Sequence, residues 1–396
     1  MNNFTFYSPT MFAFGRGEAS RVGALVRQFG GSKVLLVAGG GSVKKNGAYD
    51  AVAASLKEAG LPWCELWGVQ ANPRSGKVYE GIELARTEGA DFLLAIGGGS
   101  VIDTAKAIAH GKANPDIDIW DFWLGKKKVE KSTPVGVILT IPASGSETSD
   151  SAVLTDEIIL QKRGLNTDYN RPVFAIMDPT LAATLPRRQV ACGVTDILMH
   201  TLERYFNPIQ GNETTMQLAE SVLRVTIANG PAVVDNPGDY DAMSEIMWCG
   251  SLSHNGLTGL GGAKGLSVHP VSFALSEKFD IIHAEALSAL WCSWARYVCK
   301  VNPENEKLFA RFARSVWDIA EPNIHKAANA GIDASEAYFK SLGMPVSIGA
   351  LSCGVQDAAG VEDLAARVSY HGTRRVGTLV SLDHEALREI FEMANH

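Results

Sequence analysis

Residues 91–100 read DFLLAIGGGS, and residues 33–42 carry the same pattern as KVLLVAGGGS. In each stretch a short, nearly continuous apolar run ends in three glycines and a serine. A helical pattern follows both, at residues 48–59 and 101–110. Short apolar strands that alternate with helices are typical of a parallel sheet covered on both faces. The N-terminal half is therefore predicted to be an α/β domain.

The pattern of apolar residues changes in the middle of the chain. Residues 135–141 and 173–177 read as two further strands of the same sheet. From Arg187 onward helical periodicity dominates, and no persuasive alternating strand pattern is present. We therefore expect an α/β dinucleotide-binding domain at residues 1–185 and an all-helical metal-binding domain at residues 186–396.

Length, charge and cysteine spacing narrow the class of protein. A chain of 396 residues is too long for one compact core, which suggests two domains. The net charge of −7 provides no basic field for nucleic acid or an anionic membrane surface. The first residues lack the pattern of a secretory signal, and no apolar run reaches the roughly 20 residues of a membrane span. The six cysteines are widely spaced, which argues against a disulfide framework. These features predict a soluble, cytoplasmic protein.

Both glycine-rich turns are candidates for binding a phosphate-rich cofactor. Glycine lets the backbone approach a pyrophosphate closely, and the free N–H groups of the following helix face the anion. The bland alternative is that the glycines only make tight turns, and neither loop has a trustworthy GxGxxG spacing. The predicted cofactor-binding residues of the two turns are Gly39, Gly40, Gly41, Ser42, Lys44, Lys45, Gly97, Gly98, Gly99 and Ser100.

The first loop also bears on the choice of cofactor. A protein that reads NAD usually sets a carboxylate against the ribose 2′-hydroxyl, and that carboxylate repels a 2′-phosphate. No acid occurs here, whereas Ser42, Lys44 and Lys45 offer a donor and positive charge. The loop therefore favours NADP(H), although two lysines on a helix are also compatible with a pair that is merely solvated.

Four side chains in the second half are candidate ligands of a divalent ion. Asp196 and His200 are four apart, which puts them on one face of a helix, and His269 and His283 follow downstream. A set of Asp and His without thiolates suits Fe(II), Zn(II), Mn(II) or Co(II). Such an ion would polarise a carbonyl while a nicotinamide delivers hydride. A single histidine on a helix is more often structural, so the spacing alone leaves both interpretations open.

Several segments together resemble the iron-containing, or group III, alcohol dehydrogenase family over almost the whole chain. The resemblance implies a dehydroquinate synthase-like fold and a divalent ion held by one Asp and three His, here Asp196, His200, His269 and His283. The segments that carry it are YSPTMFAFGRGE (7–18), GGGSVIDTAKAIA (97–109), TIPASGSETSDSAVLT (140–155), RPVFAIMDPTLAATLP (171–186), GVTDILMHTLERYF (193–206), HNG (254–256) and HPVSFALSEKFDIIH (269–283).

The segment GGGSVKKNGAYD at residues 39–50 is most similar to the NADPH-dependent aldehyde reductase and butanol dehydrogenase branch. Gly39 stands where NAD-preferring relatives tend to have Asp. The resemblance also implies cofactor contacts at Asp103, Thr140, Ser149 and Lys162. It further implies a homodimer that acts on a small aldehyde or primary alcohol, with iron or zinc as the ion.

One departure and two alternatives accompany this resemblance. Family members often carry a histidine that acts as a proton carrier four residues after the first histidine of the HPxxH segment, where this chain has Phe273. One alternative is a glycerol dehydrogenase-like or dehydroquinate synthase-like enzyme that uses NAD and zinc. The other is a catalytically silent nucleotide-binding subunit of an assembly.

Overall fold

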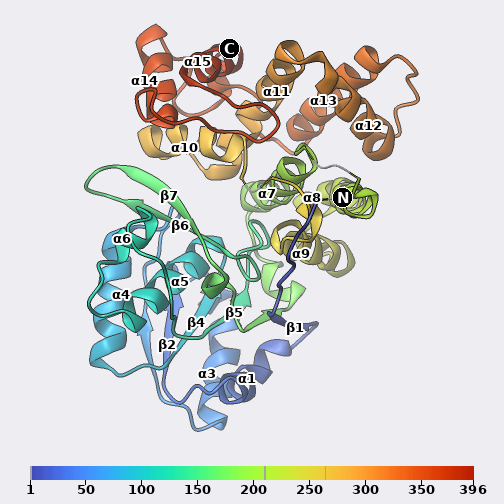
Figure 1. Cartoon of the computed structure of the whole chain (residues 1–396). Coiled ribbons are helices and arrows are strands. Elements are labelled where there is room, and N and C mark those ends of the chain that lie inside the picture. The colour runs from blue at the N-terminus through green and yellow to red at the C-terminus, as the bar shows by residue number, and fades with distance from the viewer. Residues whose placement is uncertain (1, 209–210, 264) are drawn as a thin grey trace. The chain divides into compact units, whose positions relative to one another are not determined.

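The structure is a computed structural model that describes residues 2–208, 211–263 and 265–396 (Figure 1). The chain divides into two compact units. The α/β unit comprises Tyr7–Val190 and Asp235–Gly256. The helical unit comprises Met1–Phe6, Ala191–Val234 and Leu257–His396.

A six-stranded parallel sheet forms the centre of the α/β unit, in the order β1-β8-β5-β4-β2-β3. Strands β2, β4, β5 and β8 are buried along their whole length, which is why they read as continuous apolar runs. These four strands confirm the predicted sheet. The strands are β1 (Met11–Phe14), β2 (Val34–Ala38), β3 (Trp63–Leu66), β4 (Phe92–Gly97), β5 (Val135–Leu139) and β8 (Phe174–Met177).

Helices cover both faces of this sheet, as the alternation of strands and helices predicts (Figure 1). Helices α1 and α3 pack on the face that carries Val34, Leu36 and Ala38, and α4 and α5 pack against each other on the other face. An antiparallel hairpin, β6 and β7, was not predicted. The elements are α1 (Val22–Gln28), α2 (Ser42–Lys45), α3 (Ala48–Glu58), α4 (Ser75–Thr87), α5 (Gly99–Ala113), α6 (Ile119–Trp123), β6 (Ser151–Asp156) and β7 (Gln161–Asn166).

The predicted single boundary at residue 185 differs from the observed division. Helix α9 (Tyr240–His254) belongs to the α/β unit although it lies far along the chain. The ring of Trp248 packs edge-on against Phe12 at 5.2 Å, and Ser251 Oγ donates a hydrogen bond of 2.5 Å to Glu147 Oε1. A helix of ordinary periodicity gives no sign in the sequence of which unit it packs against.

The described part of the helical unit is built from helices, with one isolated β-bridge between Val376 and Leu382. Its core is aromatic, and the rings of Phe206 and Phe309 stack at 4.1 Å. The helices are α7 (Arg187–Tyr205), which begins in the α/β unit, α8 (Glu213–Asp235), α10 (Val268–Phe279), α11 (His283–Val301), α12 (Glu306–Trp317), α13 (Ile324–Ser341), α14 (Ala358–Ser369) and α15 (His384–Ala394). Short 3-10 helices occur in both units. Those of the α/β unit are Glu18–Arg21, Asp168–Asn170 and Pro179–Ala182, and those of the helical unit are Leu257–Gly259, Pro303–Asn305 and Ile348–Ala350.

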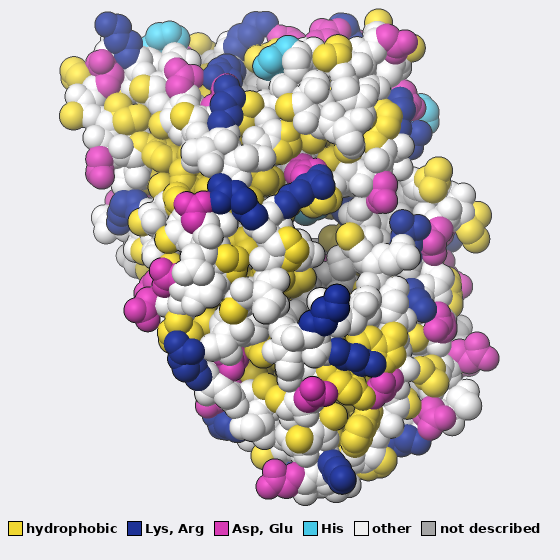
Figure 2. All heavy atoms as spheres, turned by 180° about the vertical axis from the view of Figure 1, so that it is seen from behind, with side chains coloured by type: hydrophobic (Ala, Val, Ile, Leu, Met, Phe, Trp, Pro, Cys, Tyr) yellow, Lys and Arg dark blue, Asp and Glu magenta, His cyan; other side chains and the backbone are white. Residues whose placement is uncertain are grey.

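Among the described helices, none combines the length and the hydropathy that crossing a membrane requires. On the face drawn in Figure 2, acidic and basic side chains are interspersed with apolar ones. This mixture agrees with the modest net charge of the sequence.

Candidate functional site

Three of the four predicted ligands meet inside the helical unit. Asp196 and His200 project from α7, and His269 projects from α10. One ligand atom from each lies within 4.8 Å of the others, and all three side chains are buried. The ring centroids of His200 and His269 are 4.3 Å apart. Two carboxylate or imidazole groups one helical turn apart, joined by a third from another helix, form the kind of cluster that holds a divalent ion.

His283 lies beside this cluster but outside the group of three. It is the first residue of α11, it is half-buried, and its ring centroid is 5.1 Å from that of His269. Its Nδ1 atom is 3.4 Å from Ser272 Oγ. The fourth predicted ligand is therefore a neighbour of the cluster, at a helix start.

The hydrogen bonding of the His269 ring is that of a metal ligand. Its Nδ1 atom lies 2.9 Å from Glu203 Oε1. Its Nε2 atom is buried and has no hydrogen-bond partner among the described residues. An imidazole whose one nitrogen donates to a carboxylate keeps a lone pair on the other nitrogen, which is the usual arrangement of a ligating histidine. The residues present therefore fit a borderline divalent ion.

Glu203 is a functional candidate that the sequence analysis missed. It lies on α7 three residues after His200, so helical periodicity puts it on the face that carries the ligands. Its carboxylate accepts the backbone N–H groups of Val268 and His269 at 2.7 Å each, and also that of Ser267. It therefore satisfies the free donors at the start of α10 while it orients the His269 ring. The only sign in the sequence is an acid one turn beyond a candidate ligand.

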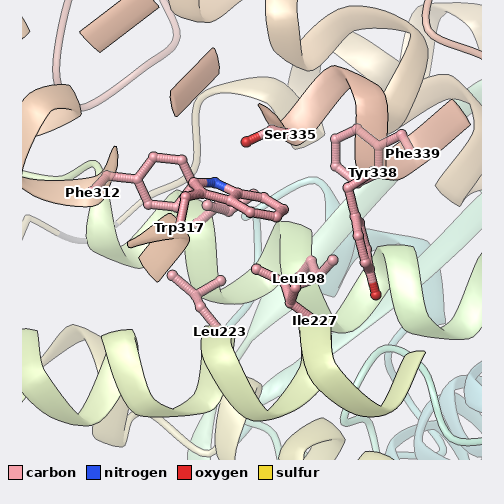
Figure 3. Close-up of a pocket in the computed structure, with 9 residues that line it drawn as sticks. Leu198, Leu223, Ile227, Phe312, Trp317, Ser335, Tyr338 and Phe339 are labelled. Carbon is pink, nitrogen blue, oxygen red and sulfur yellow. The ribbon is translucent and has the colours of Figure 1, made fainter. Parts of the chain in front are cut away.

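The opposite face of α7 lines a small apolar cavity (Figure 3). Leu198 and Leu202 lie about half a turn around the helix from Asp196 and His200. The lining is mostly apolar and has no charged side chain, and its hydroxyl groups are those of Ser335 and Tyr338. The lining residues are Leu198, Leu202, Leu223, Ile227, Phe312, Trp317, Ser335, Tyr338 and Phe339.

The two glycine turns lie side by side in the α/β unit. They follow β2 and β4, which are neighbours in the sheet. From β2 the chain passes to β3 on one side, and it then returns to β4 on the other side. Ligands of open α/β sheets bind at the carboxyl ends of strands where the strand order reverses in this way. The predicted positions Gly39, Gly40, Gly41, Ser42, Gly97, Gly98, Gly99 and Ser100 all lie at this point.

The glycines of the two turns are required for different reasons. Gly41 has φ of +103°, and a side chain there would meet no atom within 4 Å. A Cβ atom on Gly98 would lie 2.9 Å from Ile141 Cβ, and one on Gly99 would lie 2.5 Å from Ser144 Oγ. The first turn therefore needs glycine for its backbone conformation and is open. The second needs it for close packing, in partial agreement with the bland interpretation.

Asp103 lies on α5 next to a buried lysine that the sequence analysis missed. Asp103 Oδ1 accepts a 2.5 Å hydrogen bond from Ser146 Oγ, and Oδ2 accepts one of 2.9 Å from the backbone N–H of Val153. Lys106 Nζ donates to Ser146 Oγ at 2.9 Å and to the carbonyl of Ser151 at 2.7 Å. Burial lowers the pKa of Lys106 to about 8 and raises that of Asp103. A lysine inside the apolar run of this helix is the sign that marks it in the sequence.

The other predicted cofactor contacts belong to the same unit. The backbone N–H of Thr140 donates to the carbonyl of Gly97 at 3.1 Å, so Thr140 adjoins the second turn. Ser149 Oγ is 3.5 Å from Lys106 Nζ. Lys162 Nζ donates to Asn72 Oδ1 at 2.9 Å, and Asn72 is a further polar residue that the sequence analysis did not single out. Lys44 and Lys45 end the short helix α2.

Comparison with known proteins identifies the family of this chain. The model described as iron-containing alcohol dehydrogenase matches residues 9–179. The model described as the Fe-containing alcohol dehydrogenase family, C-terminal, matches residues 190–394. The chain belongs to the iron-containing alcohol dehydrogenase family. It is an oxidoreductase of alcohols and aldehydes that uses a pyridine nucleotide.

Relatives in this family carry both cofactor names. NADH-dependent butanol dehydrogenase A of Clostridium acetobutylicum is 36% identical over 393 residues, which cover 99% of each chain. NADPH-dependent aldehyde reductase YqhD of Escherichia coli is 32% identical over 400 residues, which cover 100% of each. The crystal structure of NADH-dependent butanol dehydrogenase A from Thermotoga maritima has a TM-score of 0.94 at 34% identity and covers 100% of this chain and 99% of its own. Family membership therefore does not decide between NADH and NADPH.

Proposed function

We propose that this family member is a metal-dependent aldehyde reductase that prefers NADP(H) and forms a primary alcohol. Asp196, His200, His269 and His283 would hold the ion, which is iron or zinc. The observation that carries the proposal is the approach of three buried donor groups to within 4.8 Å of one another, one of them oriented by Glu203. The homodimer that the family resemblance implies stays a prediction.

The reaction consumes an aldehyde, NADPH and one proton, and it yields a primary alcohol and NADP⁺. A bound divalent ion would supply Lewis acidity toward the carbonyl oxygen, and the nicotinamide would supply the hydride. Asp196 contributes the negative charge of the ligand set. Glu203 holds a proton on His269 Nδ1, so that Nε2 keeps its lone pair. The side chains of all three donors are buried, so few of their polar atoms are exposed to bulk water.

The alcohol oxygen also needs a proton. Phe273 lies 5.7 Å from His283 between ring centroids and has no exchangeable hydrogen. The proton therefore comes from water, from a ribose hydroxyl of the cofactor or through another residue. Phe273 instead contributes an apolar surface beside His283.

The NADP(H) preference rests on the first glycine turn. Gly39 brings no carboxylate to the ribose, while Ser42, Lys44 and Lys45 follow directly. A lack of space does not explain why position 39 carries no acidic side chain. A Cβ atom on Gly39 would lie 3.4 Å from the carbonyl oxygen of Val69, an ordinary contact.

Metal analysis coupled to a cofactor assay tests the proposal. We expect the purified protein to bind iron or zinc in an equimolar amount and to oxidise NADPH faster than NADH over a series of aldehydes of increasing size. His269→Ala should lose metal and turnover together, whereas the exposed control His325→Ala should lose neither. Bound metal without turnover would favour a silent subunit. Zinc with a preference for NAD and glycerol would favour a glycerol dehydrogenase-like enzyme.

A further inference from the structure

A carboxylate on the edge strand β3 collects three aromatic donors. Glu65 Oε1 accepts hydrogen bonds from Tyr49 Oη at 2.6 Å and from Trp63 Nε1 at 3.0 Å. Glu65 Oε2 accepts one from Trp67 Nε1 at 2.7 Å. Burial alone would raise the pKa of Glu65, but these donors and the charge of Lys44 hold it below its ordinary value. The side chain is therefore an anion at neutral pH.

This cluster adjoins the first glycine turn. Directly after Trp67, the backbone N–H of Gly68 donates to the carbonyl of Gly39 at 3.2 Å. The next N–H, of Val69, donates to the carbonyl of Ala38 at the same distance. Trp67 thus lies next to the position at which the proposed function sets the cofactor's ribose.

The cluster also holds a lysine of that turn. Lys44 Nζ lies 4.2 Å from the ring centroid of Trp67 and 5.1 Å from that of Tyr49. The two ring centroids are 5.5 Å apart. A cation over an aromatic face is attracted to the ring electrons. Glu65 is hydrogen-bonded to the same two rings that Lys44 contacts, so its negative charge lies close to the Lys44 ammonium. The proposed function assigns that ammonium to a 2′-phosphate.

We propose that Glu65 is a specificity-determining residue that reduces the advantage of NADPH over NADH. This inference rests on the proposed function, which assigns the ribose 2′ position to the first glycine turn. A 2′-phosphate adds up to about two negative charges, so it gains from Lys44 and is repelled by Glu65. The 2′-hydroxyl of NADH is neutral, so both charges affect its binding much less. The site therefore carries an attracting and an opposing charge that together set the ratio of the two affinities.

Dinucleotide binding by the metal-free protein tests this without turnover. Glu65→Gln removes the charge and keeps one oxygen that can accept from Tyr49 and Trp63, while its amide NH2 group cannot accept from Trp67. We expect the ratio of the Kd for NADH to the Kd for NADPH to rise about threefold to tenfold, and the change to shrink as salt is added. Lys44→Met should change the ratio in the opposite direction, because it should weaken the binding of NADPH several-fold and leave the binding of NADH unchanged.

Tyr49→Phe is the matched structural control, because it removes one hydrogen bond to Glu65 and keeps the charge. We expect it to lower the thermal stability and to leave the ratio of affinities unchanged. An unchanged ratio in Glu65→Gln, or an equal change in Tyr49→Phe, would overturn the inference. If NADPH binds and aldehydes are reduced while the ratio stays fixed, the inference alone fails. If neither dinucleotide binds, the proposed function fails.

Discussion

The Nδ1 atom of His269 lies 2.9 Å from Glu203 Oε1, the same oxygen that accepts the backbone N–H groups at the start of α10. One carboxylate on α7 thus fixes both the helix that carries His269 and the orientation of its ring. Such a carboxylate beyond a ligating histidine determines which ring nitrogen keeps the proton. Glu203 is consequently a positioning residue for the proposed metal site.

Glu203→Gln should weaken metal binding about tenfold to a hundredfold, because Gln is a poorer acceptor for the His269 N–H and can present its amide group instead. Titration of the metal-free protein with Zn(II) or Fe(II) measures the change. Glu245→Gln, an exposed residue of α9, is the control and should bind metal as the unmodified chain does. Metal affinity that survives Glu203→Gln unchanged would show that the His269 ring needs no such support.

Phe273→His should change the dependence of kcat on pH. The ring at this position lies 5.7 Å from His283, and an imidazole there would titrate near pH 6.5 in the absence of other influences. We expect a new inflection between about pH 6 and 7 that Phe273→Leu does not produce. Identical profiles for the chain and Phe273→His would argue against a proton-relay role at this position.

Gly39→Asp should move the cofactor preference toward NADH. A Cβ atom at this position would make only ordinary contacts, and a carboxylate there would repel a 2′-phosphate and accept from the ribose hydroxyls. The affinity for NADPH should fall about tenfold or more, by the size of one charge repulsion at short range. Gly39→Asn supplies the same bulk without the charge and should keep most of the NADPH affinity. A similar loss in both variants would mean that bulk, not charge, matters at this turn.

The fold was largely predictable from hydrophobic periodicity, and the elements that the prediction missed were missed for physical reasons. Strand β4 is recognisable as a continuous apolar run because both of its faces are buried. The edge strands β1 and β3 are partly exposed and, at four residues each, too short to show a periodic pattern. The hairpin of β6 and β7 also escaped prediction. Neither β-pairing at an edge nor the packing partner of a helix such as α9 is a local property.

The candidate site was predictable only in part for a similar reason. The spacing of Asp196 and His200 predicts one shared helical face, which the structure has. The approach of His269 depends on tertiary packing, and only the family resemblance pointed to it. Glu203 and Lys106 were missed because a single acid or lysine in a helix is usually a solvated residue. Their role depends on what their polar atoms contact.

Acid should destabilise the protein through His110, which is fully buried. Its Nε2 atom lies 2.8 Å from Asn170 Oδ1 and its Nδ1 atom 2.9 Å from Ser132 Oγ, which satisfies a neutral ring. Burial lowers the pKa of His110 from 6.5 to about 4. Between these values the unfolded chain binds a proton that the folded chain does not, so stability is lost as the pH falls through this range.

The size of this effect can be isolated with a variant that does not titrate. From pH 7 to pH 5 the loss attributable to His110 should be ~2 kcal/mol in the free energy of unfolding. His110→Gln should be less stable at pH 7 and should lose correspondingly less between the two pH values. The exposed His371→Gln should reproduce the behaviour of the unmodified chain. Equal losses in the chain and His110→Gln, measured by urea unfolding, would contradict the prediction.

Gly230→Ala should destabilise the helical unit beside the apolar cavity of Figure 3. An added Cβ atom would lie 2.1 Å from Tyr338 Oη and 2.8 Å from Val194 Cγ1, so buried groups must move. Overpacking of this kind costs about 1–3 kcal/mol. Tyr338→Phe removes the oxygen in the closer contact and should restore part of the loss in the double variant, while the contact with Val194 remains. Chemical unfolding of the single and double variants measures the coupling, and strictly additive effects would show that Gly230 and Tyr338 do not meet.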